Sequence, residues 1–130
     1  MDIVIRQATV QDCNAIQELN TAQMGYAYTY KKTLERLQNI LNDNTHRIFV
    51  AEVNAQVVAY IHCNSHELLY HDPLINIMGI AVSKRYNRMG IGRLLLQRVE
   101  TWAELHKDEL MQGWELAREH QPLYKIAPLS

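Results

Sequence analysis

The sequence contains few of the residues that mark a specialised class of protein. Its 130 residues include only two cysteines, three prolines and five glycines, which argues against a disulfide scaffold, a collagen-like repeat or a low-complexity chain. No apolar run approaches the roughly 18 residues of a membrane-spanning helix, and residues 1–6 lack the layout of a signal peptide. Cys13 and Cys63 do not form a CxxC pair, so we predict reduced core thiols in a cytoplasmic protein.

A charge excess of either sign is also missing. Thirteen Lys and Arg residues against 14 Asp and Glu residues give a net charge of −1. A dedicated nucleic-acid binder would need a strong basic excess, so we expect neither nucleic acid nor a membrane as a partner. With 48% hydrophobic residues, we expect one domain over residues 1–130, because a chain of this length can bury about two-thirds of its surface without metals or disulfides.

The sequence does have regular changes of hydrophobic period. Short β-branched or alternating runs predict strands, and apolar residues three or four positions apart predict helices. Strands are expected at residues 3–6, 48–53, 57–63 and 75–82, with helices from Val10 to near Gly25, over residues 34–41 and from Ile91 to Leu105. The order β-α-α-β-β-β-α, with a hairpin turn at residues 54–56, predicts a mixed α/β fold built on an antiparallel meander.

The most informative segment is residues 80–96, where an apolar strand ends in a basic turn that opens directly into a helix. Gly90 and Gly92 let the backbone approach a ligand closely, and the N–H groups and dipole of the following helix favour a phosphate. Four cations surround the same point: Lys84, Arg85, Arg88 and Arg93. We predict a diphosphate-binding turn; the alternative is a helix start that uses glycine only for tight packing.

Two common phosphate motifs do not fit this turn. A P-loop needs Gly, four residues and then Gly-Lys-Ser/Thr, which the sequence lacks. A dinucleotide-binding turn needs G-x-G-x-x-G within a βαβ unit, whereas Leu95 stands at the third glycine position and the preceding strands are expected to be antiparallel.

The strand, turn and helix resemble the acetyl-CoA-binding motif of the GNAT superfamily of N-acetyltransferases, a (Gln/Arg)-x-x-Gly-x-(Gly/Ala) turn. Residues 86–92 fill the turn and Arg-Leu-Leu-Leu follows at residues 93–96, while the family's Gln/Arg position is Asn87. The resemblance covers about residues 1–106 and implies the acyl-CoA N-acyltransferase fold, with residues 107–130 as an atypical tail. Residues 25–52 are similar to the small-molecule, aminoglycoside-type members.

The resemblance implies acetyl-CoA as co-substrate and no metal. Backbone groups of Ile80, Ala81 and Val82 would pair with the pantetheine arm. The pyrophosphate would be held at Asn87, Arg88, Met89, Gly90, Ile91, Gly92 and Arg93. Tyr26 and Tyr28 lie where the family walls its acceptor pocket, and they are expected either to contact the acceptor amine or to be ordinary loop aromatics.

The proton-transfer groups that the resemblance implies are poorly matched. Asn76 stands near the position at which many relatives carry a carboxylate, and an amide cannot act as a general base. Glu67, with His66, His71 and Asp72 beside it, is the substitute, unless these are solvated loop groups. Tyr124 is a weak match to the family's tyrosine, because Pro122 interrupts the helix expected there. The irregular spacing of His62, His66 and His71 argues against a metal cluster.

Two functions of different classes follow from the resemblance. The first is an acetyl-CoA-dependent N-acetyltransferase that acts on a primary amine of a small molecule, with activity weakened by the atypical tail. The alternative is a non-catalytic acyl-CoA-binding or regulatory module on the same fold. We also expect a homodimer, because an incomplete C-terminal half leaves the strand at residues 75–82 with an uncovered edge; Trp114, Leu116 and Leu123 of the tail are the alternative cover.

Overall fold

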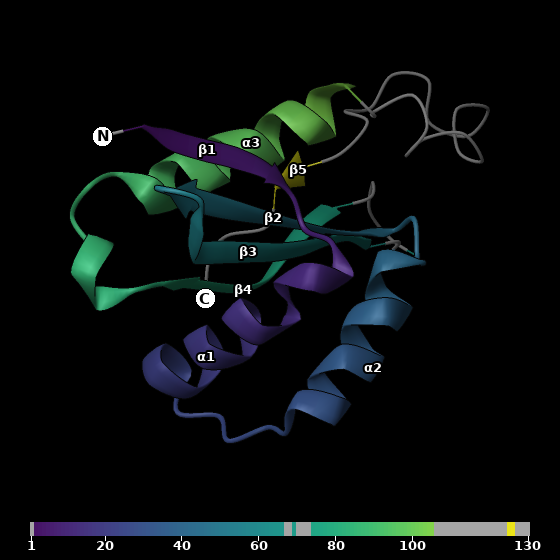
Figure 1. The fold of residues 1–130 in the computed structure, drawn as a ribbon. Coiled ribbons are helices and arrows are strands. Elements are labelled where there is room, and N and C mark those ends of the chain that lie inside the picture. Colours follow the sequence, from purple (N-terminus) through teal and green to yellow (C-terminus); the bar gives the residue numbers. More distant parts are fainter. Residues whose placement is uncertain (1, 67–68, 70–73, 106–124, 127–130) are drawn as a thin grey trace.

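A β-sheet separates one helix from two others (Figure 1). The computed structural model describes residues 2–66, 69, 74–105 and 125–126. Strands β1 (Ile3–Gln7), β2 (His46–Val53), β3 (Gln56–His66) and β4 (Leu74–Val82) are antiparallel in chain order, and β5 (Lys125–Ile126) is parallel to β4. Helix α3 (Ile91–Leu105) covers one face, and α1 (Cys13–Met24) with α2 (Tyr30–Leu41) covers the other. The predicted mixed α/β class and element order are confirmed.

The central strands are buried on both faces. On β2, Phe49, Ala51 and Val53 pack in the cluster beneath α3, whereas Ile48 and Val50 pack beneath α1 and α2. Successive side chains of a strand point to opposite faces, so a strand covered on both sides needs an almost continuous apolar run. That requirement explains the sequence Ile-Phe-Val-Ala at residues 48–51.

The ends of α1 are set by local polar contacts and one glycine. A 3₁₀ turn, η1 (Val10–Asp12), precedes the helix, and the Thr9 N–H donates to the Asp12 carboxylate at 2.8 Å. This is the reciprocal half of a capping box. Gly25 ends the helix at φ 74°, a left-handed conformation that glycine adopts without steric cost. The predicted end near Gly25 is confirmed, whereas the predicted start at Val10 is a 3₁₀ turn and the α-helix itself begins at Cys13.

The hairpin between β2 and β3 uses a two-residue turn. Val53 pairs with Gln56, and Asn54 and Ala55 between them have φ values of 52° and 64°. Positive φ at both central residues is the type I′ geometry that matches the twist of paired strands. The hairpin was predicted, with the turn one residue longer than the structure shows.

Strand β4 contains one residue more than its neighbour at its middle. Cys63 pairs with Ile77 and His62 pairs with Gly79, so Met78 has no counterpart on β3. This bulge shifts the alternation of side chains by one residue. The apolar residues on both sides of it therefore face the same cluster beneath α3: Ile75, Ile77, Ile80 and Val82.

The C-terminal tail contributes β5 to the edge of β4. Lys125 pairs with Leu74 and Ile126 with Ile75, in parallel. Beyond Ile75, no second strand among the described residues pairs with β4. Several predicted positions lie outside the described residues: Glu67, His71, Asp72, Trp114, Leu116, Leu123 and Tyr124. Within the described part of the chain, no helix has the length and apolar character needed to cross a membrane.

Candidate functional site

The basic turn leads from the end of β4 into α3 through two left-handed residues. A short 3₁₀ turn, η2 (Lys84–Tyr86), is followed by Arg88 at φ 67° and Gly90 at φ 79°. The Leu94 N–H donates to the Gly90 carbonyl at 3.0 Å, so this is an early bond of α3. The N–H groups of residues 91–93 come before it in the first turn, where a helix leaves its donors available to an anion.

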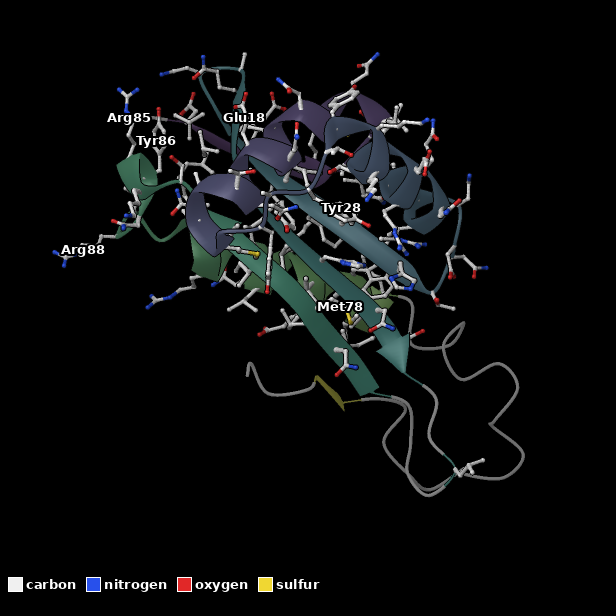
Figure 2. All side chains as sticks on the ribbon, turned by 90° about the horizontal axis from the view of Figure 1, so that it is seen from below. Glu18, Tyr28, Met78, Arg85, Tyr86 and Arg88 are labelled. Atoms are coloured by element: carbon white, nitrogen blue, oxygen red, sulfur yellow. The ribbon has the colours of Figure 1, made fainter. Side chains whose placement is uncertain are left out.

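A cavity of about 600 Å³ lies in the bend of this turn. It is lined by Val82, Tyr86, Asn87, Arg88, Gly90, Ile91, Gly92 and Arg93. The Arg85 guanidinium lies 6.0 Å from the centre of the Tyr86 ring, and Figure 2 shows Arg85 and Arg88 projecting from the turn. The cavity therefore joins backbone donors of a helix start to several cations, which is the chemistry that binds a diphosphate.

The remaining residues predicted at this turn have other surroundings. Met89 is in the same turn with an exposed side chain, whereas Ala81 is buried beneath α1 and α2. Ile80 packs beneath α3 and lines a second cavity. From Ile77 to Val82, β4 has a strand partner on one side only among the described residues, so its other edge has no ladder partner within them.

The second cavity, also about 600 Å³, lies at the bulge of β4. Its lining comes from α1, the following loop, β3 and β4: Asn20, Met24, Tyr26, Tyr60, His62, Ile77, Met78, Gly79 and Ile80. The Tyr60 hydroxyl donates to the Asn20 amide oxygen across it. A Cβ added to Gly79 would lie 3.7 Å from the Met24 methyl carbon. We call this the bulge cavity.

A third cavity of about 320 Å³ lies between α1, α2 and the sheet, and we call it the side chamber. Its lining is Ile16, Asn20, Tyr28, Thr33, Arg36, Leu37, Ile40, Ile48, Tyr60 and His62. Asn20, Tyr60 and His62 line both this chamber and the bulge cavity. The two spaces are therefore neighbours that share one polar wall.

His62 belongs to that wall and is paired with His46, which lines neither cavity. His46 Nδ1 and His62 Nε2 are 2.8 Å apart, and the rings stack with centroids 5.0 Å apart. Asp43 Oδ2 is 3.8 Å from His46 Nε2. Burial, reinforced by the positive charge that His46 can carry, lowers the pKa of His62 to about 4. His62 is therefore neutral at pH 7.

The loop between α1 and α2 places the two predicted tyrosines at different cavities. Tyr26 lines the bulge cavity and Tyr28 lines the side chamber. The loop is held to α1 because Gln17 Nε2 donates to the Tyr28 carbonyl at 2.9 Å and the Thr21 hydroxyl donates to the Tyr26 carbonyl at 3.1 Å. Both rings are exposed, and Figure 2 shows Tyr28 beside the two helices.

The cysteines are structural. Cys13 and Cys63 are both free and buried, as predicted. Burial raises the pKa of the Cys13 thiol and raises that of Cys63 to about 12. A thiol that stays protonated at pH 7 is a poor nucleophile, so neither side chain is a candidate for covalent catalysis. No group of three potential metal ligands occurs within the described ranges.

The histidine pair and the side chamber were missed in the sequence analysis. His62 was considered there only as a member of a metal cluster. The register of the hairpin provides a signal: Ile48 pairs with His62 and His46 with Asn64, which puts the two histidines on one face as diagonal neighbours. The chamber has no comparable signal, because it depends on how far two helices stand from the sheet.

Comparison with known proteins agrees with this geometry. The model of the acetyltransferase (GNAT) family matches residues 13–124. An uncharacterised N-acetyltransferase of Chlorobaculum tepidum is 27% identical over 99 residues, which are 76% of this chain. The chain spans only 59% of that relative's length.

Two aminoglycoside-related structures have the same fold. An aminoglycoside 6′-N-acetyltransferase from Acinetobacter baumannii superimposes with a TM-score of 0.72 at 16% identity, over 98% of this chain and 80% of its own. A structure of AAC(6′)-Iy with the bisubstrate analogue CoA-S-monomethyl-acetylneamine superimposes with a TM-score of 0.75 at 15% identity, over 100% of this chain and 80% of its own. The sheet and helices are thus those of the acyl-CoA N-acyltransferase fold, and the family match over residues 13–124 shows that the chain belongs to the acetyltransferase (GNAT) family.

Proposed function

We propose that this protein transfers the acetyl group of acetyl-CoA to the primary amine of a small molecule. The observation that carries the proposal is the order of three features along β4: the bulge cavity, an edge without a second strand among the described residues, and the cavity at the basic turn. Figure 2 shows Met78 on β4 well away from Arg85 and Arg88 on the turn. A long ligand with a diphosphate at one end and a reactive thioester at the other matches this layout.

The residues present fit acetyl-CoA. The pyrophosphate would lie at the start of α3, with Arg88 and Arg93 beside it. The pantetheine amides would pair with the edge of β4 from Ile80 to Val82, as an added strand does. Bulges re-aim backbone groups, so the Met78–Gly79 region would direct an N–H towards the thioester carbonyl, where oxyanion stabilisation is needed.

The chemistry is a direct group transfer. The neutral amine nitrogen attacks the thioester carbonyl carbon, a C–N bond forms and the C–S bond breaks; the nitrogen gives up one proton to become an amide, and CoA leaves as a thiolate that takes up one proton. Before attack the substrate ammonium must lose a proton. His62 lines the bulge cavity and is neutral at pH 7, so it can form a hydrogen bond with the amine, whereas a pKa of about 4 makes it a weak general base. Glu67 and Tyr124 remain predictions for the base and the acid.

The cellular location, the oligomeric state and a weakened activity are also part of the proposal. Two buried free thiols are typical of a reducing compartment, which supports a cytoplasmic location. The edge of β4 that lacks a second strand among the described residues supports a homodimer. An activity weakened by residues 107–130 stays part of the proposal, because the family's tyrosine position is matched only by Tyr124.

Calorimetric titration with acetyl-CoA, followed by measurement of CoA release with a panel of amines, tests the function. Binding with amine-dependent CoA release supports the enzyme. Binding without release for any amine supports the non-catalytic module instead, and absence of binding would contradict both.

A matched pair at Gly92 tests the assigned pyrophosphate site. A Cβ at Gly92 would meet only the Ile80 Cδ1 atom, at 3.9 Å, so both variants of the pair fit the fold. Gly92→Asp adds a negative charge beside the pyrophosphate and should weaken acetyl-CoA binding at least tenfold, whereas Gly92→Ala should keep a folded helix and lose much less. Equal affinities for the two variants would place the pyrophosphate elsewhere.

A further inference from the structure

The walls of the bulge cavity and the side chamber lack the negative charge that a site for polycations needs, among the described residues. Among the described residues that line the bulge cavity and the side chamber there is no Asp or Glu. Arg36 is the one Lys or Arg side chain in those linings, and the His62 ring there is neutral at pH 7. An aminoglycoside carries several ammonium groups, and its recognition requires carboxylates or many hydrogen-bond acceptors.

The side chamber is lined mainly by hydrocarbon. Ile16 from α1, Leu37 and Ile40 from α2, and Ile48 from β2 surround it, with the ring of Tyr60 from β3. Four of these side chains are buried: Ile16, Leu37, Ile48 and Tyr60. An apolar cavity of about 150 Å³ is large enough to bind benzene. A chamber of about 320 Å³ can therefore hold a single aromatic ring or a branched aliphatic group.

Three of the polar residues that line the chamber, Asn20, Tyr60 and His62, stand where it meets the bulge cavity, whereas Tyr28, Thr33 and Arg36 line the chamber alone. The Tyr60 hydroxyl donates a hydrogen bond to the Asn20 amide oxygen, and His62 lines the same shared wall. A molecule that spans the two spaces would place its apolar group in the chamber and a polar group at this wall, next to the bulge of β4. The proposed acetyl transfer places the acceptor amine at this position, beside the thioester.

From this arrangement we propose that the acceptor is a monoamine bearing a compact apolar group, aromatic or branched aliphatic, which occupies the side chamber. The inference rests on the proposed acetyl transfer and specifies its substrate class. Burial of a phenyl-sized group contributes binding energy in proportion to the apolar area removed from water. An amine without such a group gains none of it, and a polycation loses hydration without gaining partners.

The first test compares three acceptors by their kcat/KM in CoA release. The value for 2-phenylethylamine should exceed that for ethylamine, and that for the aminoglycoside kanamycin, by at least tenfold. If kanamycin or ethylamine is acetylated as efficiently as 2-phenylethylamine, the substrate class is wrong while acetyl transfer stands. If acetyl-CoA does not bind or no amine is acetylated, the proposed function fails and the inference fails with it.

Variants of α2 residues test whether the preference for an amine with an apolar group depends on the side chamber. Ile40→Trp should fill it, reducing kcat/KM for 2-phenylethylamine at least tenfold while leaving that for ethylamine within about twofold. Leu34→Trp is the control, because Leu34 is a partly buried residue of the same helix that does not line the chamber. Ile40→Ala, which enlarges the chamber, should shift the preference towards 4-phenylbutylamine and covers the case in which the tryptophan variant does not fold.

A binding measurement complements turnover. The alcohol 2-phenylethanol has the ring but no amine, and it should compete with 2-phenylethylamine in the wild-type protein and in Leu34→Trp, but at least fivefold more weakly in Ile40→Trp. Equal competition in all three proteins would place the ring outside the chamber and overturn the inference.

Discussion

Burial and the neighbouring imidazole of His46 both lower the pKa of His62. The side chain is partly buried between the sheet and the helices and lies 2.8 Å from the Nδ1 atom of His46. Both effects disfavour the imidazolium form in the folded protein, so the pKa falls from its usual 6.5 to about 4. A histidine in this state takes part in hydrogen bonds as a neutral ring, and its protonation at low pH destabilises the folded protein.

This shift predicts how stability depends on pH. Between about pH 6.5 and pH 4 the unfolded chain binds a proton at His62 and the folded chain does not, so the free energy of unfolding falls as the pH falls through this window. Below pH 4 both states are protonated and this contribution levels off. The loss amounts to about 1–3 kcal/mol, allowing for screening by solvent.

Urea unfolding at a series of pH values, for the wild type and for His62→Gln, measures this effect. The variant should lose less stability than the wild type between pH 6.5 and pH 4, and the two curves should run parallel above pH 7. Parallel curves over the whole range would show that His62 is not the group responsible.

At the scale of an element, β4 combines a structural and a functional role through one additional residue. The bulge at Met78 keeps Ile77 and Ile80 on the α3 face, although they are three positions apart. Removal of the bulged residue would leave Cys63 opposite Ile77 and His62 opposite Gly79 as consecutive pairs. The apolar pattern would then be unchanged, and only the local bend of the strand would be lost.

We therefore predict that deletion of Met78 separates folding from catalysis. The deleted protein should fold with a stability within about 2 kcal/mol of the wild type. It should bind acetyl-CoA within about tenfold of the wild-type affinity and lose about 100-fold or more in acetyl transfer, since the oxyanion donor is misplaced. Calorimetry and CoA release measure these properties.

Met78→Ala is the control for that deletion, because it removes the side chain and keeps the bulge. Its acetyl transfer should stay within about tenfold of the wild type. Full activity of the deletion variant would show that the bulge plays no part in catalysis.

The elements differ in how far the sequence could predict them. The hairpin at Asn54 and the end of α1 at Gly25 follow from local turn chemistry, which a sequence displays directly. The bulge has a signal as well, since the apolar alternation of Ile75 and Ile77 resumes one residue late at Ile80. Strand β5 has no such signal, because two residues without periodicity become a strand only through pairing with β4.

In the candidate site too, features set by consecutive residues could be predicted and features set by tertiary packing could not. The basic turn at Arg88 and Gly90 depends on consecutive residues and could be predicted. The side chamber brings together α1, α2, β2 and β3, and its volume is set by side-chain packing between layers. Sequence patterns indicate which faces are apolar but not where packing leaves a space, so the substrate preference could be inferred only from the structure.

At the scale of the whole molecule, the edge of β4 has two potential occupants. Past Ile75 it lacks a second strand among the described residues, and Met78 on this segment is 53% exposed. Unpaired strand edges are templates for another chain, and a second copy placed about a two-fold axis would pair β4 with β4. The pantetheine arm of acetyl-CoA is proposed to use the same edge from Ile80 to Val82.

A ligand and a partner copy that need the same backbone groups must oppose each other by linkage. We predict a homodimer at micromolar concentration whose dissociation constant rises when CoA is added, so that the mass measured by light scattering falls from about twice the monomer mass towards the monomer mass. Met78→Lys should weaken the dimer without CoA, since a charged side chain on an edge strand discourages pairing. A monomer at every concentration would rule out the dimer, and a dimer insensitive to both CoA and Met78→Lys would place the interface on another surface.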